Sequence, residues 1–380
     1  MLHNVKNPNA DKILPLLQGD SYALFAQAVL NGNAKGTVYV DDIQNPTVAA
    51  ILSHEEERCY LTLQSAGNDL KTWQTVLSET VLRDQFEENG AAMEMFLHPE
   101  ADNSVHDIFR TMEAAWNPAY LFSWNNDRSL EPPSAIPDGF ILQPVTQAFL
   151  NSKNIENLDL ILDEWCERTD NVNGVRGFCL LKENTVASVC HIDFHNSDAV
   201  EIGIITDQNY RRQGLAVVVV SNTIQYFKEH GIRHIIWHAP ADNKGSCAVA
   251  ARSGLTIERE FGEYWMHYTH SCVLLLHAHH YFRSGKFREA AEYYRRALRA
   301  EKNEIKPFAG WHERIEVLSW ILEYYNLLQD EDSLGSVLSE LPAYNIRLSA
   351  QQIEAYEKNP DHDFITHTDT WQRWKNRSDT

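Results

Sequence analysis

A polar stretch with three prolines, residues 125–139, separates two parts of the chain that carry similar patterns of strands and helices. Proline has no backbone N–H and disfavours a helical conformation in the residue before it. The stretch therefore cannot continue a helix or a central strand, and we interpret 125–138 as a linker between two domains.

Length and composition agree with this division. A chain of 380 residues predicts two or three domains, and 43% hydrophobic residues are enough for packed cores, which excludes a disordered protein. The longest aliphatic runs are much shorter than the roughly 20 residues of a membrane span, and the amino terminus has no apolar signal core. The six cysteines form no Cys-x-x-Cys pair. We expect reduced thiols and a cytoplasmic location.

The charge narrows the range of partners. The chain has 33 Lys and Arg against 53 Asp and Glu, a net charge of −20. Such acidity argues against nucleic acid or an anionic membrane as the main partner, because both require clustered basic residues. It favours cationic small molecules or basic peptides.

Both parts have α/β patterns. Before the linker, residues 1–124 predict helices and strands in the following order: helix 22–30, strands 36–40, 48–52 and 59–63, helix 70–88, strand 93–97, helix 105–112 and a last strand around 120–124. After it, residues 139–270 predict strand 140–145, helical stretches within 147–167, strands 177–181, 186–194 and 199–206, helix 215–230, strand 234–238, helix 244–253 and strand 256–268. Antiparallel strands followed by a β-α-β-α-β segment predict a mixed sheet with helices on both faces.

The remaining residues, 271–380, are patterned as helices. One pair has the spacing of a tetratricopeptide repeat, through Ala278, Tyr281, Gly285, Ala290, Tyr294, Ala297 and Leu298. A second pair, 311–341, matches more loosely. One repeat is too few for a free solenoid, so we expect these helices to pack on the catalytic domain, a second subunit or a protein partner.

The stretch most informative about chemistry joins the strand 199–206 to the following helix. That helix begins near Gly214, and a helix start offers unpaired N–H groups and a partial positive charge that hold a pyrophosphate. Gly214 and Ala216 leave room for phosphates, and Arg211 and Arg212 add cationic donors. Taken alone, the stretch could equally be an ordinary strand–turn–helix junction.

A second motif follows at the proper separation. Arg211-x-x-Gly214-x-Ala216 and Asn243…Ser246…Arg252-x-Gly254-Leu255 together resemble the two signatures of the Gcn5-related N-acetyltransferase (GNAT) superfamily. The resemblance covers about residues 139–268. It implies acetyl-CoA as cofactor, direct acetyl transfer to an amine, and a strand that diverges from its neighbour to admit the pantetheine arm.

The same resemblance implies roles for particular residues. Backbone N–H groups around Ile204, Ile205 and Thr206 would polarise the thioester carbonyl. The pyrophosphate would lie against Arg211, Arg212, Gln213, Gly214, Leu215 and Ala216, and Asn243 belongs to the same cofactor-binding set.

The catalytic acid departs from the family pattern. The family usually places a Tyr seven residues after Asn243, where this chain has Ala250. The proton for the leaving thiolate would come from water, Tyr264 or Tyr268, or the thiolate would leave unassisted, since its free pKa is only about 8.5.

Glu201 is the first candidate for the general base, because the family often has an acidic residue on this strand. The alternative is a solvent-facing or salt-bridged strand glutamate. The run from His191 through Asp193 to His195 places three polar groups on one strand face, so His191 and His195 are further candidates. No further ligand has convincing spacing, and we expect no metal.

The first part lacks the signature at the corresponding loop, 61–70, and we interpret residues 1–124 as a degenerate acetyltransferase-like domain that shapes the substrate cleft. By architecture and length the chain is similar to bacterial self-resistance acetyltransferases that inactivate zwittermicin A and related aminopolyol or polyamine-peptide antibiotics. That similarity implies a cationic amine substrate. Two alternatives stay open: a peptide or protein N-acetyltransferase that docks its substrate on the carboxy-terminal helices, and a non-catalytic scaffold.

Overall fold

The computed structural model describes residues 2–17, 20–54, 57–67, 69–89, 92–125, 133–152, 154–158, 171–301 and 312–378. Most of the predicted linker, the predicted helical residues 159–167, Cys166 and Trp311 lie outside these ranges. The chain forms two compact units, each assembled from three segments. The first contains Met1–Ser65, Phe96–Asp102 and Asn117–Glu263, and the second contains Ala66–Met95, Asn103–Trp116 and Tyr264–Thr380.

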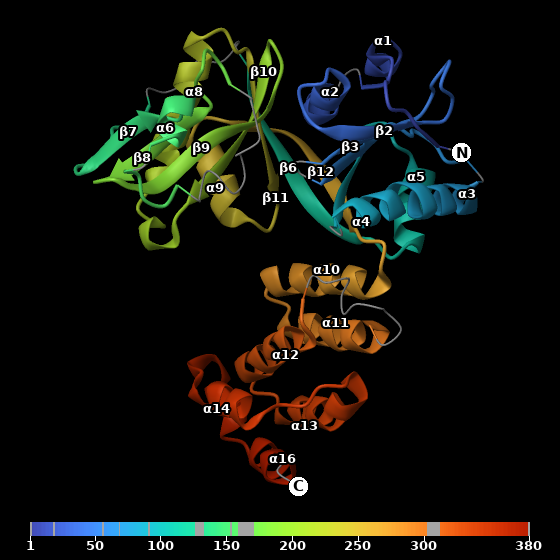
Figure 1. Ribbon diagram of the computed structural model, residues 1–380, viewed down its shortest axis with the longest axis vertical. Helices are drawn as coiled ribbons and strands as arrows, with labels where there is room; N and C mark the ends of the chain where they lie inside the picture. The colour runs from blue at the N-terminus through green and yellow to red at the C-terminus, as the bar shows by residue number, and fades with distance from the viewer. Residues whose placement is uncertain are drawn as a thin grey trace. The chain divides into compact units, whose positions relative to one another are not determined.

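The first unit is built on β-strands that come from both sides of the linker (Figure 1). One run of antiparallel neighbours is β1 (His3–Asn4), β2 (Gly36–Val40), β3 (Ala49–Ser53) and β4 (Arg58–Leu61). A second run has the order β6 (Ala115–Asn125), β11 (His234–Pro240), β10 (Ala199–Thr206), β9 (Thr185–His195), β8 (Gly177–Lys182) and β7 (Phe140–Pro144). Within the second run β10 and β11 are parallel, and the other neighbouring strands are antiparallel. The predicted mixed sheet is confirmed, and the predicted strands 36–40 and 199–206 match to the residue.

Helices cover both faces of β10 and β11. Ala199 and Ile236 pack on one face with α2 (Leu24–Leu30) and the short α1 (Ala10–Ile13). Their neighbours Val200 and Ile235 point the other way, into a core with α8 (Leu215–Glu229) and α9 (Lys244–Arg252). Successive strand residues face opposite sides of a sheet, so a parallel pair covered on both faces has apolar residues on both. The short α6 (Gln147–Leu150) packs against β8 and β9.

The second unit contains the other strand pair and a helical layer. The end of β12 (Thr256–Met266) pairs antiparallel with β5 (Met93–Leu97). The predicted helix 70–88 is present as α3 (Leu70–Val76), a π-helical stretch (Leu77–Leu82) and α4 (Arg83–Asn89), followed by α5 (Asn103–Thr111). The π-helical stretch is a local widening of the helix that sequence periodicity does not reveal.

The two parts of the sequence exchange their last strands. Strand β6, the last before the linker, pairs along β11, with Ile236 opposite Ser123. Strand β12, the last of the following part, pairs with β5, with Tyr264 opposite Met95. The sequence pattern predicts the strands but gives no sign of this exchange, because strand partners are set by tertiary packing.

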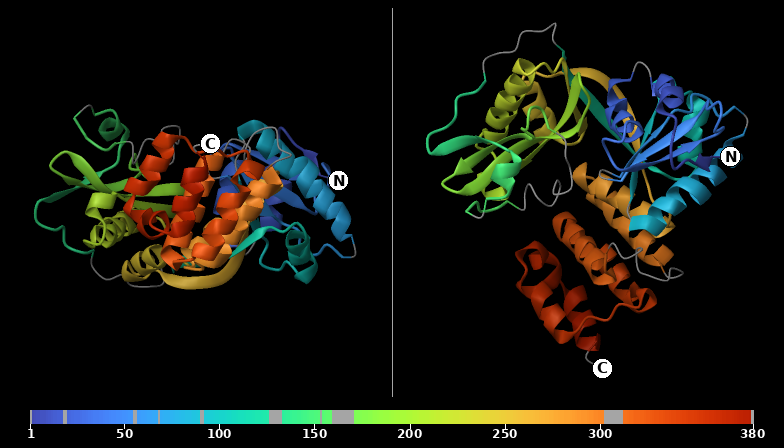
Figure 2. Two further views of the ribbon diagram at one scale, coloured as in Figure 1. Left: turned by 90° about the horizontal axis from the view of Figure 1, so that it is seen from below. Right: turned by 45° about the horizontal axis from the view of Figure 1, so that its top comes forward.

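The carboxy-terminal region is helical, as predicted. Its helices share one apolar core and are α10 (His270–Arg283), α11 (Phe287–Ala300), α12 (Arg314–Leu328), α13 (Glu331–Glu340), α14 (Ala350–Lys358), α15 (Asp363–Thr366) and α16 (Asp369–Ser378). Figure 2 shows these helices, coloured from orange to red, from two further directions. Ala278, Ala290 and Tyr294, three of the predicted repeat positions, are completely buried. Their tetratricopeptide character stays a prediction.

Two further expectations concern cysteines and membranes. In the described residues the cysteines are free, and all except the half-buried Cys247 are buried. Burial raises the pKa of the Cys59, Cys179 and Cys190 thiols to about 12. No helix in the described part of the chain is both long and apolar enough to cross a bilayer.

Candidate active site

Strands β10 and β11 pair only over their first three residues. In the described chain their parallel partners are Ala199 with His234, Val200 with Ile235, and Glu201 with Ile236, although β10 continues to Thr206 and β11 to Pro240. At the same point the register of β10 against β9 shifts between Glu201 and Ile202. The extra residue is Asp193 on β9, where such a bulge bends the strand, and the pairing of β10 with β11 ends at the same level. The diverging strand implied by the family resemblance is therefore present.

Beyond the divergence β10 still pairs with β9 through Ile204, Ile205 and Thr206. In an antiparallel pair alternate N–H groups point to the partner, and the others point to the opposite side. On β10 that opposite side is the one from which β11 has diverged. Backbone donors are thus available for a carbonyl oxygen, as predicted for these residues, although which of them would bind it stays a prediction.

The turn after β10 leads into α8 through two residues in the left-handed region, Arg212 (φ +62°) and Gly214 (φ +81°). Gly214 is the residue before the first turn of α8, and no side chain caps that end. A Cβ atom added at Gly214 would meet no described heavy atom within 4 Å. The first-turn N–H groups of a helix have no partner within the helix. Open space beside such groups fits the pyrophosphate of a coenzyme.

The other residues of the turn have different positions. The Arg211 Nε donates to the Thr206 carbonyl at 3.1 Å, and the Gln213 amide donates to the Asn209 carbonyl at 3.4 Å. The Leu215 side chain is buried in the core, so only its backbone can reach a ligand, whereas Ala216 is half-buried. Arg212 is exposed and can contribute its charge.

The second signature helix, α9, shows why the family's tyrosine is absent. Ala250 is completely buried in the core that α8 and α9 share, where a tyrosine ring would not fit without repacking. The Asn243 Oδ1 accepts the Ser246 N–H at 3.1 Å and caps the helix. Its predicted contact with the cofactor stays a prediction.

Glu201 lies at the divergence and is buried, with 2% of its side chain exposed. Its Oε1 accepts a hydrogen bond from the Arg58 Nη1 at 2.7 Å, and Arg58 is on β4, in the part of the chain before the linker. The Glu201 Oε2 has no partner among the described residues. Burial raises the pKa of Glu201, and Asp193 adds to this, although Arg58 and His238 oppose it. The glutamate is therefore salt-bridged, one of the two alternatives that the sequence left open, and its Oε2 is buried.

His191 and Asp193 are on β9, the strand that pairs with β10 beside Glu201. The His191 Nε2 lies 2.6 Å from the Asp193 Oδ1, and His191 is buried. Opposite His191 is Gly203, where a Cβ would lie 2.5 Å from the imidazole ring. A glycine is needed at this position because the ring covers the strand. The prediction that three polar groups share this strand face rests on strict alternation, which the extra residue Asp193 interrupts: Ile192 and Phe194 pack in different cores, and His195 is half-buried at the strand end.

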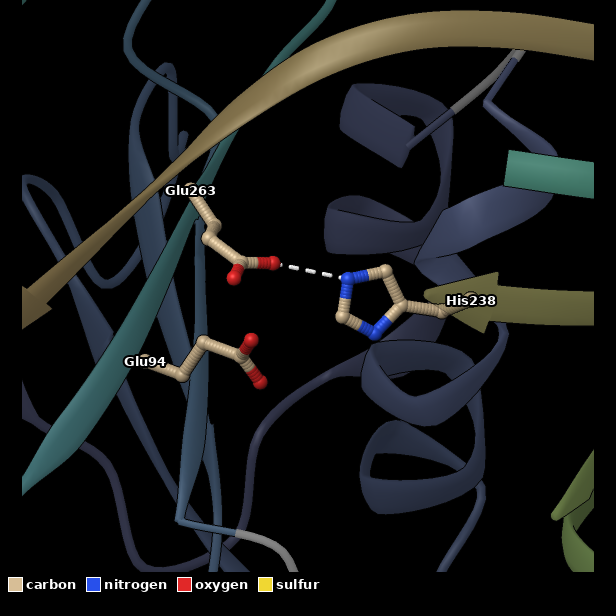
Figure 3. Close-up of side chains that lie close together, drawn as sticks. All are labelled: Glu94, His238 and Glu263. Atoms are coloured by element: carbon tan, nitrogen blue, oxygen red, sulfur yellow. Dashed lines mark hydrogen bonds and ion pairs between the residues drawn. The ribbon is translucent and has the colours of Figure 1, made fainter. Parts of the chain in front are cut away.

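A second histidine–carboxylate pair, not anticipated from the sequence, completes the polar set. His238 of β11 and Glu263 of β12 form a 2.7 Å contact between Nε2 and Oε2 (Figure 3), and both side chains are almost fully buried. The rings of Tyr22 and Phe96 pack edge-on against His238. We refer to Arg58, His191, Asp193, Glu201, His238 and Glu263 as the buried polar cluster. No local pattern in the sequence identified His238, Glu263 or Arg58.

Tyr264, the predicted acid, belongs to the second compact unit. Its hydroxyl is hydrogen-bonded to the His106 Nδ1 at 2.9 Å, and its ring stacks on Phe109. Burial raises the pKa of Tyr264, which makes it a weaker acid. Tyr268 stacks on Phe86 at the surface of the same unit.

A parallel strand pair that diverges beside a buried carboxylate, followed by a helix that starts on an open glycine, fits a coenzyme A-dependent acyltransferase. The sequence matches the GNAT acetyltransferase family over residues 14–264, and the chain belongs to this family. Membership implies acetyl-CoA as the acetyl donor. The matched region begins well before the linker, so it includes the part that lacks the pyrophosphate signature.

The individual relatives share low sequence identity with this chain. The chain is 26% identical over 138 residues to the uncharacterized N-acetyltransferase YdfB of Bacillus subtilis, which is 36% of this chain and 52% of that protein. The chain thus spans about half the length of the curated relative it matches. A GCN5-related N-acetyltransferase-like protein from Streptococcus suis is 18% identical, with a TM-score of 0.48 over 68% of this chain and 98% of that one. A GCN5-related N-acetyltransferase from Sphaerobacter thermophilus is 11% identical, with a TM-score of 0.49 over 70% of this chain and 96% of that one.

Proposed function

We propose that this protein is an acetyl-CoA-dependent N-acetyltransferase that acetylates a primary amine of a cationic small molecule. The observation that carries the proposal is Glu201: a buried carboxyl with one unpartnered oxygen, at the point where β10 leaves β11. An amine that is protonated in water must lose a proton before it can attack a carbonyl.

Glu201 is suited to accept that proton. Its pKa is raised by burial, which brings a carboxyl closer to the pH at which a general base works best. Its Oε1 is fixed by Arg58, so Oε2 is the oxygen that would receive the proton. His191, oriented by Asp193, is the second candidate, and its neutral imidazole would serve the same role.

The cofactor fits the turn before α8. Acetyl-CoA would supply the acetyl group as a thioester. Gly214 and the first-turn backbone of α8 would hold its pyrophosphate, with Arg212 adding charge. The N–H groups of Ile204 to Thr206 that face away from β9 would orient the carbonyl. No side chain at position 250 protonates the leaving group, so we assign that proton to water.

Negative charge supports a cationic substrate. Besides the net charge of −20, the first unit has a cavity of about 660 Å³ on the face of α2, and its lining includes Asp11, Asp20 and Asp198. Ala199 and Ile236, the neighbours of Glu201 on the paired strands, also line it. Asp20 is ion-paired with Arg259 and Asp198 with Arg233, so the attraction for a polycation comes mainly from the net charge of the whole chain. This supports an aminopolyol or polyamine-peptide antibiotic as substrate, and thus a self-resistance role in a bacterial cytoplasm.

We further propose that the part before the linker is a degenerate acetyltransferase-like domain that no longer binds the cofactor. After β4 its loop 61–67 lacks the Arg-x-x-Gly-x-Ala signature. Its contributions to the site are Arg58 and the strand β6.

The substrate class is tested by mass spectrometry. The protein is incubated with acetyl-CoA and three panels: aminopolyol antibiotics, simple polyamines, and lysine-containing peptides. We expect a mass increase of one acetyl group on members of the first two panels. Turnover of peptides with none of any small polycation would contradict the proposed substrate and support a peptide acetyltransferase.

Cofactor placement is tested at Gly214. We expect Gly214→Ala to reduce acetyl-CoA affinity by about 10-fold or more in calorimetry, because the methyl group enters the space proposed for the pyrophosphate. Gly231, at the other end of α8, has the same left-handed backbone (φ +92°) and the same open surroundings. Gly231→Ala therefore carries the same conformational cost, about 1 kcal/mol, and is the matched control. Equal affinity in both variants would show that the cofactor lies elsewhere.

A further inference from the structure

A cavity between α12 and α14, in the carboxy-terminal helical region, has the features of a ligand site. Its volume is about 440 Å³, within the range of small-molecule sites. Ser319, Trp320 and Glu323 lie on one side of α12, at spacings that place them on the same helix face. Gln352, Tyr356 and His362 line it from α14 and the turn that follows.

The aromatic side chains of the cavity are held in fixed positions. The Tyr356 hydroxyl is 2.7 Å from the Ser319 Oγ. The Trp320 ring packs against Tyr294 and His279. Burial lowers the pKa of His279 to about 4, so this neighbour is uncharged at neutral pH. Two preorganised aromatic rings, one of them packed on an uncharged imidazole, form a surface to which an organic cation is attracted.

Glu323 supplies an uncompensated negative charge. No described cationic side chain forms an ion pair with it, and it is half-buried. Burial, with a smaller contribution from Asp361, raises the pKa of Glu323. A carboxylate that is desolvated and faces a like charge is stabilised when a cation arrives.

A polar nitrogen in the same cavity also lacks a partner. His362 is 3% exposed, and its Nδ1 has no hydrogen-bond partner among the described residues. Burial lowers the pKa of His362, so the ring is neutral and does not repel a cation. Buried polar atoms are nearly always hydrogen-bonded, so a bound polar group in the cavity could supply the partner that Nδ1 lacks.

We propose that the cavity between α12 and α14 binds an alkyl ammonium group, with Glu323 as the counter-ion and Trp320 and Tyr356 as the walls. The same chemistry is offered by the side chain of a lysine in a peptide and by a free diamine. This site is separate from the buried polar cluster, and its existence does not depend on the proposed acetyl transfer.

The test is calorimetry on the full chain with three ligands: Nα-acetyl-lysine methylamide, 1,4-diaminobutane, and Nα-acetyl-norleucine methylamide, which keeps the alkyl chain without the charge. We expect the lysine ligand, the diamine or both to bind, and the norleucine ligand not to bind. Stronger binding of the lysine ligand assigns the site to a peptide, and stronger binding of the diamine assigns it to a free amine.

Substitutions at and away from the cavity show where the amine ligand binds. Glu323→Gln should weaken it about tenfold, between the effects typical of exposed and of buried ion pairs. Glu354→Gln is the matched control, because Glu354 is exposed on α14 and paired with Lys358. Equal binding by Glu323→Gln, binding of the norleucine ligand, or no binding of either amine at millimolar concentration would overturn the proposal. Loss of binding in Glu201→Gln, with retention in Glu323→Gln, would also overturn it and place the amine in the candidate active site.

Discussion

Glu201→Gln is expected to lower kcat by about 10²- to 10⁴-fold, the range that a positioned general base contributes. Glutamine has nearly the same shape and can still accept the hydrogen bond from Arg58, but it cannot take up a proton from the amine. Because Glu201 is on the opposite sheet face from the core shared with α8, the affinity for acetyl-CoA should not change. Steady-state kinetics with an amine identified by mass spectrometry measures the first effect, and calorimetry the second.

Glu260→Gln is the control for this substitution. Glu260 is also a strand glutamate, on β12, but it is exposed, so its loss should leave kcat within twofold. An unchanged kcat in Glu201→Gln would contradict the assignment of Glu201, and His191→Gln would then be the variant expected to lose activity. Loss in both variants would indicate that the two groups act on the same proton.

Arg58→Met is expected to move the acid limb of the pH–rate profile to higher pH by about 1 to 3 units. The sign follows from the contact: Arg58 stabilises the ionised carboxylate and so opposes the effect of burial, which raises the pKa of Glu201. Without the cation the carboxyl holds its proton to a higher pH and is a base in a smaller fraction of molecules at pH 7. Activity should therefore fall at neutral pH and recover as the pH is raised.

Arg58→Lys separates this electrostatic effect from simple loss of structure. Lysine keeps the positive charge, so it should restore most of the wild-type pH profile even where its geometry is less favourable. A uniform loss at all pH values in Arg58→Met, unrelieved by lysine, would mean that Arg58 only supports the fold. A pH profile that shifts in Arg58→Met and returns in Arg58→Lys would identify Arg58 as a positioning residue that sets the pKa of Glu201.

The parts of this site that could be predicted from the sequence are those with a local pattern. The strand before Thr206, the glycine at 214 and the helix after it follow from adjacent residues, because a helix start and its preceding strand are specified within about fifteen positions. The position of Glu201 beside the divergence follows from the same strand. The absence of the usual tyrosine is also visible in the sequence at Ala250, and its burial explains it.

The contacts between distant residues could not be predicted in this way. Arg58 and Glu201 are 143 positions apart and meet only after both strands have packed. No sequence pattern identifies His238 and Glu263, because a buried strand is expected to be apolar. Their pairing offsets the free-energy cost of burying two polar side chains. Tyr264 has the chemistry of a general acid, but its phenol is already hydrogen-bonded to His106.

The exchanged strands have a consequence for the history of the molecule. If the two parts arose by duplication of one ancestral unit, β6 and β12 crossed over, and each copy then completed the sheet of the other. From that point neither copy could be deleted, because its loss would expose the hydrogen-bonding edge of a buried strand. Under that history the copy before the linker would have been free to lose a cofactor signature while its backbone was retained. Mutational drift in that copy would be restrained at β6 and Arg58 and permitted in the loop after β4.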